Sequence, residues 1–335
     1  NTDWFDLLFK NSVMHNHAVS ISGGSDKTSY YGSLSLMDDP GWSIADKVRR
    51  YTANFNMAYN FTEKLRLGFN TSSSYRDQKV PGTNARVFDN FSGAYTRGFD
   101  INPFSYALNT SRTMRAKGED GNPFYYRRNY APFSILNELE NNTIGITMLD
   151  SKFQADLNYK PIKELELNAL ASARFVKTSQ IESATEHSNR AMAYRATDDS
   201  YVIENNTYLY KDPEQVNSYP QVVLPAGGFY NTTDDILKSY YLRASANFNK
   251  IFNEDHIVNV LGGGELKFAD RSNRWTDGYG MQYDKGLTPN TDYRIIKQLL
   301  ESSRDYFGLY NSYDRYVAFF ATTSYSYQGK YTLNL

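Results

Sequence analysis

The sequence predicts an all-β protein, a transmembrane antiparallel β-barrel of the outer-membrane type. Connections between its strand-like segments alternate strictly between short and long, the segments alternate between apolar and polar residues, and tyrosine and phenylalanine are abundant. The short connections are Gly23–Lys27, Phe61–Glu63, Pro161–Lys163, Phe252–Asp255 and Gln328–Gly329, and the long ones are Asp38–Asp46 and roughly residues 78–142, 179–236 and 271–313. Tight periplasmic turns that alternate with long extracellular loops are typical of such barrels.

The composition is compatible with this fold. The 335 residues are 40% hydrophobic and 22% charged, with a formal net charge of −1 and a mean hydropathy of −0.62. No run of roughly eighteen apolar residues exists, which excludes a transmembrane helix, whereas barrel strands average to mild hydrophilicity. The balanced charge offers no basic face for nucleic acid. The 29 Tyr and 20 Phe suit a membrane–water boundary, and the absence of cysteine requires stability without disulfides.

The first four strands form two hairpins. Residues 16–22 and 29–37 flank the glycine-containing turn that begins at Gly23. In residues 51–61 the apolar set Tyr51 to Phe61 occupies every second position, and Thr and Asn occupy most of the others, which is a strong strand signal. The next segment, from Leu65 to Arg76, continues the alternation, so the second hairpin is about as long as the hydrocarbon core of a bilayer requires.

Five further strands and the start of a tenth follow. Residues 153–159 and 165–175 pair across a short turn, with Ala, Leu, Phe and Tyr on one face and Gln, Asn, Ser and charged residues on the other. Residues 237–250 repeat this pattern, and residues 256–268 and 314–327 show it more weakly. The tenth strand starts at Lys330. In residues 262–264 a glycine run predicts a bulge or the close approach of a plug inside the barrel.

Alternation alone leaves two architectures open. In a soluble sandwich the apolar face is the core, and in an outer-membrane barrel it meets lipid. Three features favour the barrel: strands longer than globular sheets use, aromatic residues near strand ends, and long loops on one side only. Residues 2–10 predict a short helix with a Thr or Asp cap, on the extracellular side. Both chain ends, at Asn1 and Leu335, read as cuts.

Several stretches, taken in order, resemble one family. The passage NTDWFDLLFKNSVMHNHAVSISGGSDKTSYYGSLSLMDDPGW is similar to the barrel entry of SusC/RagA-like TonB-dependent outer-membrane transporters. The matching motifs are Thr2-Asp3-Trp4, the turn Ser20 to Lys27, and Tyr30-Tyr31-Gly32-Ser33-Leu34. Residues 133–142, 159–169 and 317–334 resemble the family's barrel strands and turns, and residues 103–114 resemble one of its subgroups.

This resemblance implies a part of a plugged barrel of about 22 strands. Residues 1–335 would then be the N-terminal portion of the barrel domain, with neither plug nor TonB box, and residues 1–14 the end of an extracellular loop. It also implies active import of large nutrients, most often oligosaccharides. The implied partners are a SusD-like surface lipoprotein, the TonB complex acting through an upstream segment, outer-membrane lipid, and a second transporter–lipoprotein pair. The implied location is the outer membrane of a Gram-negative, Bacteroidetes-like cell, crossed by many strands.

Catalysis and metal binding find little support. The acidic pairs at Asp38, Asp198 and Asp234 lie in loops or at strand ends, where Asp is an ordinary turn residue, so no enzyme is expected. Asp198, Asp199 and Glu204 are a weak candidate for a loop Ca²⁺ site without EF-hand spacing. His15 and His17 share a strand face but have no evident third ligand. No other cofactor is expected.

The long loops carry the best candidates for function. Aromatic rings among Arg, Asn and Asp suit sugar faces, peptide backbones or a protein lid, although they could equally pack the loops together. The candidate contact residues are Trp42, Tyr95, Tyr106, Tyr125, Tyr126, Tyr208, Tyr210, Tyr230, Trp275 and Tyr279. Four arginines fall on the polar strand face and are predicted to face the lumen: Arg66, Arg76, Arg174 and Arg243.

Three functions stay open at this point. The leading one is TonB-dependent import of oligosaccharides. A peptide importer of the same family is the first alternative, and an adhesive or structural barrel that transports nothing is the second. No motif in the sequence encodes the substrate.

Overall fold

The computed structural model describes residues 1–82, 86–89, 94–97, 101–215 and 217–335, with the backbone alone for 86–89 and 94–97. One large antiparallel sheet of eleven described strands dominates it. Ten of them pair in chain order: β1 (His15–Gly24), β2 (Thr28–Asp39), β3 (Lys47–Thr62), β4 (Leu65–Pro81), β9 (Asn142–Ile162), β10 (Leu165–Ala184), β11 (Gly228–Phe252), β12 (His256–Gln282), β14 (Phe307–Tyr327) and β15 (Tyr331–Asn334). The eleventh, β13 (Thr288–Pro289), is two residues long and pairs with β12. The predicted nine strands and the start of a tenth are confirmed.

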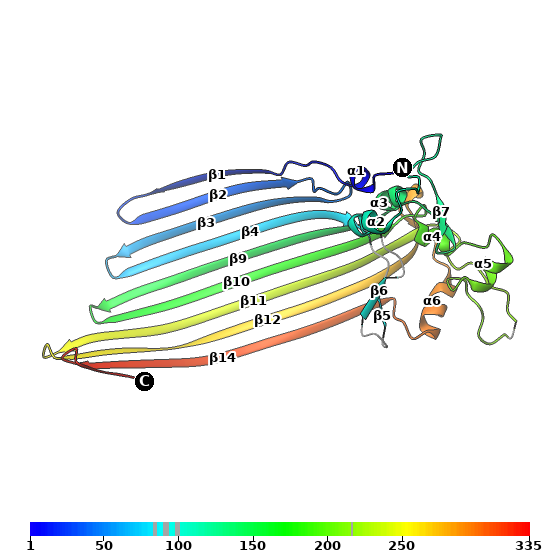
Figure 1. Cartoon of the computed structure of the whole chain (residues 1–335). Coiled ribbons are helices and arrows are strands. Elements are labelled where there is room, and N and C mark those ends of the chain that lie inside the picture. The colour runs from blue at the N-terminus through cyan, green and yellow to red at the C-terminus, as the bar shows by residue number, and fades with distance from the viewer. Residues whose placement is uncertain (83–85, 90–93, 98–100, 216) are drawn as a thin grey trace.

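The predicted rhythm of turns and loops is confirmed as well. Every tight turn lies at one end of the sheet, and the helices lie at the other (Figure 1). Two of the turns use left-handed backbone, at Asn253 and Glu254 (φ 51° and 63°) and at Gln328 and Gly329 (φ 51° and 63°). Paired positive φ values match the right-handed twist of the flanking strands, which is why such turns can be this short.

The pairing register places the apolar and polar residues on opposite faces of the sheet. Leu67 lies opposite Leu157, and Leu157 lies opposite Ala169. Large side chains on this apolar face are exposed, with 50% of Phe153 and 86% of Phe319 accessible. Within the described ranges the strands form this one large sheet and two small hairpins, so no second sheet buries the apolar face. A sandwich core is therefore excluded, and the face is suited to lipid.

The apolar face forms a band of limited height. On β10 it runs from Leu165 to Phe175, which matches the roughly ten residues that a tilted strand needs to cross a bilayer. Towards the loops, charges appear on this face just past the aromatic rings. Arg49 pairs with Asp38 at 3.0 Å, and Arg315 pairs with Asp270 at 2.6 Å. These pairs mark the outer boundary of the band, because charge at mid-bilayer is costly.

The strands run further towards the loops than the sequence predicts. The segments expected at 237–250 and 256–268 are strands β11 and β12, of 25 and 27 residues. The loops correspondingly shrink to 82–141, 185–227 and 283–306. Alternation of apolar and polar residues ends where the strands leave the lipid band, although the backbone pairing continues. A prediction based on alternation therefore stops at the edge of the band.

Short elements fill the loops. The predicted N-terminal helix is α1 (Trp4–Leu8), whose cap Asp3 accepts hydrogen bonds from the Phe5 and Asp6 amides. The expectation that residues 133–142 form barrel strand and turn is wrong, because Ile135–Asn141 is a helix, α3. The sequence analysis missed the remaining elements: α2 (Pro103–Asn109), α4 (Asn189–Ala193), α5 (Ser200–Asn205), α6 (Tyr293–Glu301), the 3₁₀ turn η1 (Tyr283–Lys285), β5 (Arg86–Asp89), β6 (Ala94–Arg97), β7 (Tyr126–Arg128), β8 (Ala131–Phe133) and β13 (Thr288–Pro289).

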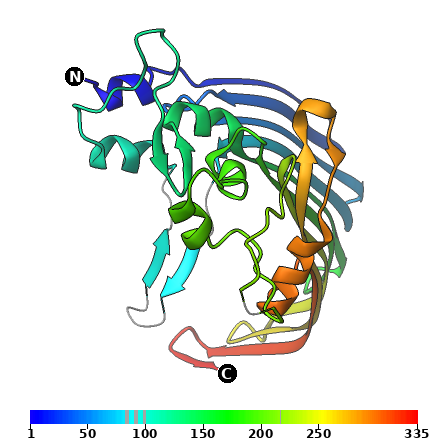
Figure 2. The same cartoon turned by 90° about the vertical axis from the view of Figure 1, so that its right-hand side faces the viewer.

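The hydrophobic core of the described residues sits in this loop layer. One cluster packs Trp4, Leu8, Tyr106 and Phe133 together, and a second packs Val223, Leu224, Phe229 and Ile295. Seen from the loop end, the sheet bends into an open arc, and the loop elements lie across the space that it partly encloses (Figure 2). None of the helices in the described ranges is long and apolar enough to cross a membrane.

The bulge predicted at residues 262–264 is wrong. Gly262, Gly263 and Gly264 pair in unbroken register with both neighbouring strands. A Cβ on Gly263 would lie 2.6 Å from the ring of Phe320 on β14, on the polar face. Glycine is needed there because the Phe320 ring lies directly over it.

Candidate functional site

The long loops pack against one another in one layer, and Asn189 joins two of them through hydrogen bonds. This residue is fully buried, and its amide nitrogen lies 2.8, 3.1 and 3.0 Å from the carbonyl oxygens of Arg128, Ala131 and Pro132. The loop 185–227 is thereby fixed to the β7–β8 hairpin of the loop 82–141. Buried amide–carbonyl bonds of this kind are costly to break.

Glu138 on α3 joins the same two loops. Its Oε1 accepts a hydrogen bond of 2.6 Å from the Asn189 backbone amide. Among the described residues, the buried Oε2 has no hydrogen-bond partner, and neither has the Oδ1 of Asn142. Burial raises the pKa of the Glu138 carboxyl from 4.5 to about 7. The ionised form is disfavoured at this junction because water cannot solvate it.

A half-buried arginine, Arg195, joins residues at the base of the loop 185–227. Arg195 donates from Nε to the Leu224 carbonyl at 2.9 Å and from Nη1 to the Glu186 carbonyl at 3.1 Å, and its Nη2 contacts the Gly227 carbonyl. Burial lowers the pKa of its guanidinium. The three guanidinium nitrogens thus bind three backbone carbonyl oxygens, which would otherwise need water as their hydrogen-bond partner.

The weak Ca²⁺ candidate is not supported. Asp198 and Asp199 each pair with Arg127, at 3.3 and 3.1 Å, and Asp199 also caps α5 through the Val202 amide. The Val202 amide and Arg127 lower the pKa of Asp199. In the part of the chain that the structure describes, no three His, Asp or Glu side chains are grouped as metal ligands.

Three of the ten candidate contact residues lie inside the loop layer. Tyr106, Tyr210 and Tyr279 are 5, 6 and 8% exposed. Tyr106 packs edge-on against Trp4, and burial raises its pKa. A ring enclosed on all sides cannot meet a ligand, so these three residues stabilise the layer.

Three candidates expected in loops are in the long strands of the main sheet instead. Tyr230 is in β11, and Trp275 and Tyr279 are in β12. The cause is the extension of these strands beyond the lipid band. Trp275 lies opposite Gly308, which leaves room for the indole ring. The side chain of Tyr95, in β6, lies outside the described residues.

The remaining four candidates do lie in the loop layer. Tyr126 packs against Phe133, and Tyr208 stacks on Tyr194 with ring centroids 4.7 Å apart, so both are half-buried. Tyr125 and Trp42 are exposed, by 42 and 67%. Among the nine candidates whose side chains the structure describes, these two are the most exposed.

Trp42 belongs to a group of four rings, here called the aromatic patch, in which Phe5, Trp42 and Phe104 are exposed and Phe9 is half-buried. Phe9 lies 5.9 Å from Trp42 and 6.3 Å from Phe104, and Phe5 lies 5.9 Å from Phe104, measured between centroids. The rings come from α1, α2 and the loop 40–46. Clustered exposed aromatic rings are characteristic of protein-binding surfaces.

A polar cleft of about 470 Å³ opens at the tip of the loop 185–227. Tyr219, which is 69% exposed, stands on its rim. The remaining lining residues are Ser200, Ile203, Glu204, Lys211, Asp212, Gln215, Asn217, Ser218 and Pro220. An aromatic face beside carboxylates and amides can stack on a sugar ring and bond to its hydroxyls.

Tyr219 and the other residues of this cleft are not among the residues predicted from the sequence. Tyr219 follows a stretch of ordinary turn residues, and its neighbours in sequence do not distinguish it. The cleft arises because α5 is brought against residues 211–220, with Lys211 Nζ 3.2 Å from the Glu204 carbonyl oxygen. No local pattern encodes such a contact.

The four predicted arginines share one face. Arg66 lies opposite Asn158, Asn158 lies opposite Asn168, and Asn168 lies opposite Ser245, so alternation places Arg76, Arg174 and Arg243 on the same side. Arg174 donates from Nε and Nη2 to the two carboxylate oxygens of Asp150, at 3.0 and 2.7 Å. Arg243 lies over the Phe320 ring. That this face lines the lumen stays a prediction.

His15 and His17 lie side by side on β1, with ring centroids 6.2 Å apart. The register places Asp38 opposite His15. Within the described ranges no third ligand joins them, and the structure gives no reason to call this pair a metal site.

The architecture first defines a class of protein. A solved structure described as the RagAB peptide transporter aligns with 99% of this chain at a TM-score of 0.67 and 17% identity, and the chain covers 32% of it. A second structure, described as the RagAB peptide importer in its open-open state, aligns equally well at 18% identity. At these identities the likeness shows the fold alone, an antiparallel sheet that forms part of a large β-barrel and is not closed in this chain.

Sequence comparisons then find stretches of this chain that are similar to TonB-dependent receptors. TonB-dependent receptor P26 of Formosa agariphila is 33% identical over 132 residues, which are 34% of this chain and 13% of that protein. TonB-dependent receptor SusC of Bacteroides thetaiotaomicron is 39% identical over 79 residues, 24% of this chain and 8% of that protein. No family model matches. The resemblance seen in the sequence is confirmed, and these relatives are receptors, not enzymes. The matched stretches span a small part of the relatives.

Proposed function

We propose that this chain is the N-terminal portion of the barrel domain of a TonB-dependent importer that takes up oligosaccharides across the outer membrane. The observation that carries the substrate class is the polar cleft with Tyr219 at its rim, which combines an exposed ring with Glu204, Gln215 and Asn217. Sugars are bound by this combination of a stacking face and planar hydrogen-bonding groups. Energy would come from the TonB complex through an upstream segment.

The cleft can be tested in the full-length receptor with a panel of labelled oligosaccharides. Tyr219→Ala is expected to weaken binding of the panel's best member about five- to tenfold, because one stacked ring contributes roughly 1 kcal/mol. Equilibrium binding to receptor in nanodiscs measures this. Tyr293→Ala is the matched control, since Tyr293 is 75% exposed but lies outside the cleft.

A peptide panel run in parallel distinguishes the second candidate. Peptide import is favoured by the description of the similar RagAB structures as a peptide transporter. Binding of peptides and not of glycans would replace the oligosaccharide proposal. Binding of neither panel, in cells that still display the receptor, would favour an adhesive barrel.

We also propose that a SusD-like surface lipoprotein covers the extracellular mouth and contacts the aromatic patch. Three of its rings are exposed and come from three separate segments, so a partner seated there would bury Phe5, Trp42 and Phe104 at once. Two transporter–lipoprotein pairs would then associate as a dimer.

Trp42→Ala is expected to reduce recovery of the lipoprotein with the tagged full-length receptor by about tenfold, since a central tryptophan is a typical hot spot. Quantitative mass spectrometry of the purified complex measures the ratio. Tyr201→Ala, which removes an equally exposed ring elsewhere in the loops, should leave recovery unchanged. Equal recovery with both variants would place the contact elsewhere.

A further inference from the structure

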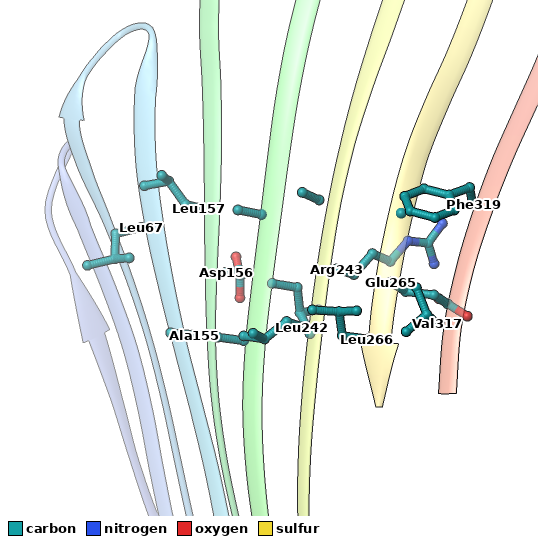
Figure 3. Close-up of a pocket in the computed structure, with 15 residues that line it drawn as sticks. Leu67, Ala155, Asp156, Leu157, Leu242, Arg243, Glu265, Leu266, Val317 and Phe319 are labelled. Atoms are coloured by element: carbon teal, nitrogen blue, oxygen red, sulfur yellow. The ribbon is translucent and has the colours of Figure 1, made fainter. Parts of the chain in front are cut away.

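The apolar face of the sheet is hollowed by a groove of about 700 Å³, a feature separate from the loop sites. One continuous row of cross-strand neighbours crosses it. Leu67 and Leu157 stand at one end, Val317 and Phe319 at the other, and small side chains lie between (Figure 3). The row reads Leu67, Leu157, Ala169, Ala244, Gly264 and Phe319.

Side-chain size explains the hollow. A second row of cross-strand neighbours lies next to the first, on its loop side. In it Ala155 and Ala171 are again small, and Leu242, Leu266 and Val317 form the wall of the groove. A second hollow of about 480 Å³ shares Ala169 and Ala244 with the first and continues over Ala246 and Gly262. Together the two hollows form one trough, whose floor of small residues lies on β9, β10, β11 and β12.

The trough offers no polar partner to a ligand. The three charged residues beside it have side chains that alternation assigns to the opposite face. There, Glu265 accepts a 2.6 Å hydrogen bond from Tyr241, Asp156 bonds to Asn70, and Arg243 lies over Phe320. The backbone along the trough is paired within the sheet. A ligand would therefore be purely apolar.

The position of the trough identifies its surroundings. On β10 it covers Leu167 to Ala171, inside the band that runs from Leu165 to Phe175. It is thus continuous with the surface that faces membrane hydrocarbon, well below the charge pairs at the outer boundary. In that medium the available apolar ligands are lipid tails.

We propose that the trough is a binding site for one acyl chain of a membrane phospholipid. A chain lying between the leucine and phenylalanine walls gains contacts on three sides, whereas a chain on the smooth remainder of the band gains them on one side. Dispersion contacts are small individually and add up along the chain. The bound chain therefore exchanges more slowly than its neighbours.

Photo-labelling of the full-length receptor tests this proposal. The receptor is placed in nanodiscs that contain a phospholipid with a diazirine on one acyl chain, and labelled peptides are mapped by mass spectrometry. Labelling should concentrate on residues 155–157, 167–171 and 242–246. In Ala244→Phe, labelling of these peptides should fall about fivefold, because the filled groove offers no more contact than the rest of the band.

Ala173→Phe is the matched control, since Ala173 is on the same face of β10 but lines neither hollow. It should leave the labelling pattern unchanged. Heat-modifiable migration on gels shows whether both variants fold, and Ala171→Leu replaces Ala244→Phe if that variant does not. Labelling spread evenly over the band, or unchanged by groove filling, overturns the proposal. Cross-links between two receptor copies through the trough would overturn it in favour of a dimer contact.

Discussion

Replacing Ala171 by arginine is expected to destabilise the folded full-length receptor in its membrane by about 2–4 kcal/mol, while Ser172→Arg changes its stability by less than roughly 1 kcal/mol. Both residues are in the middle of β10, one position apart. Ala171 is on the apolar face, between Ala155 and Leu242, and Ser172 is on the polar face, between Gln154 and Tyr241. Only the first substitution places a charge in hydrocarbon.

Reversible unfolding from lipid vesicles in denaturant gives the two free energies of unfolding. The comparison is internally controlled, because both variants introduce arginine into the same strand and differ in the face that carries it. Equal destabilisation by both variants would contradict the assignment of faces. A larger effect of Ser172→Arg would invert it and place lipid on the side that carries Arg66 and Arg174.

The second large effect concerns pH and Glu138. Its pKa is about 7 in the folded loop layer and 4.5 in an open one. Below about pH 4.5 the carboxyl is neutral in both states. As the pH rises from 4.5 to 7, only the open state loses its proton, so closure of the layer is weakened by roughly 3 kcal/mol in total. Above pH 7 the penalty stays constant.

Glu138→Gln should abolish this dependence, because the amide stays neutral and Oε1 can still accept from the Asn189 amide. Hydrogen exchange of residues 189–193 between pH 4 and 8, corrected for intrinsic exchange rates, measures the opening free energy of both proteins. The difference between wild type and variant isolates Glu138 from Asp199 and Asp292, whose lowered pKa values act in the opposite direction. A difference that does not change with pH would refute the assignment.

The barrel strands were predictable because lipid imposes a simple rule on them. Each strand between Tyr51 and Phe61, or between Leu165 and Phe175, must alternate to face hydrocarbon on one side, and the sequence shows that alternation directly. Sidedness followed from connection length alone. The helical segment at Trp4 to Leu8 was predictable because it carries its own cap.

The loop layer was not predictable, because no lipid boundary imposes a regular pattern on its sequence. The contacts that stabilise it join residues far apart in sequence, such as Asn189 with Ala131 or Arg127 with Asp198. Rings such as Tyr106 and Tyr210 have the composition of a binding surface but are enclosed by contacts that no local pattern records. Residue type therefore indicated that the loops are aromatic, but not which rings are buried.

The length of the strands beyond the lipid band has a mechanical consequence. On β12 the backbone runs fourteen residues past Phe268, from there to Gln282, so the paired sheet continues outward by roughly 35 Å at the usual tilt and rise. Flexible tethers would let the loops collapse onto the lipid headgroups. A stiff hydrogen-bonded wall instead keeps the Tyr219 cleft at a fixed height above the lipid band, which is where the proposed importer would meet a bulky nutrient before the membrane surface.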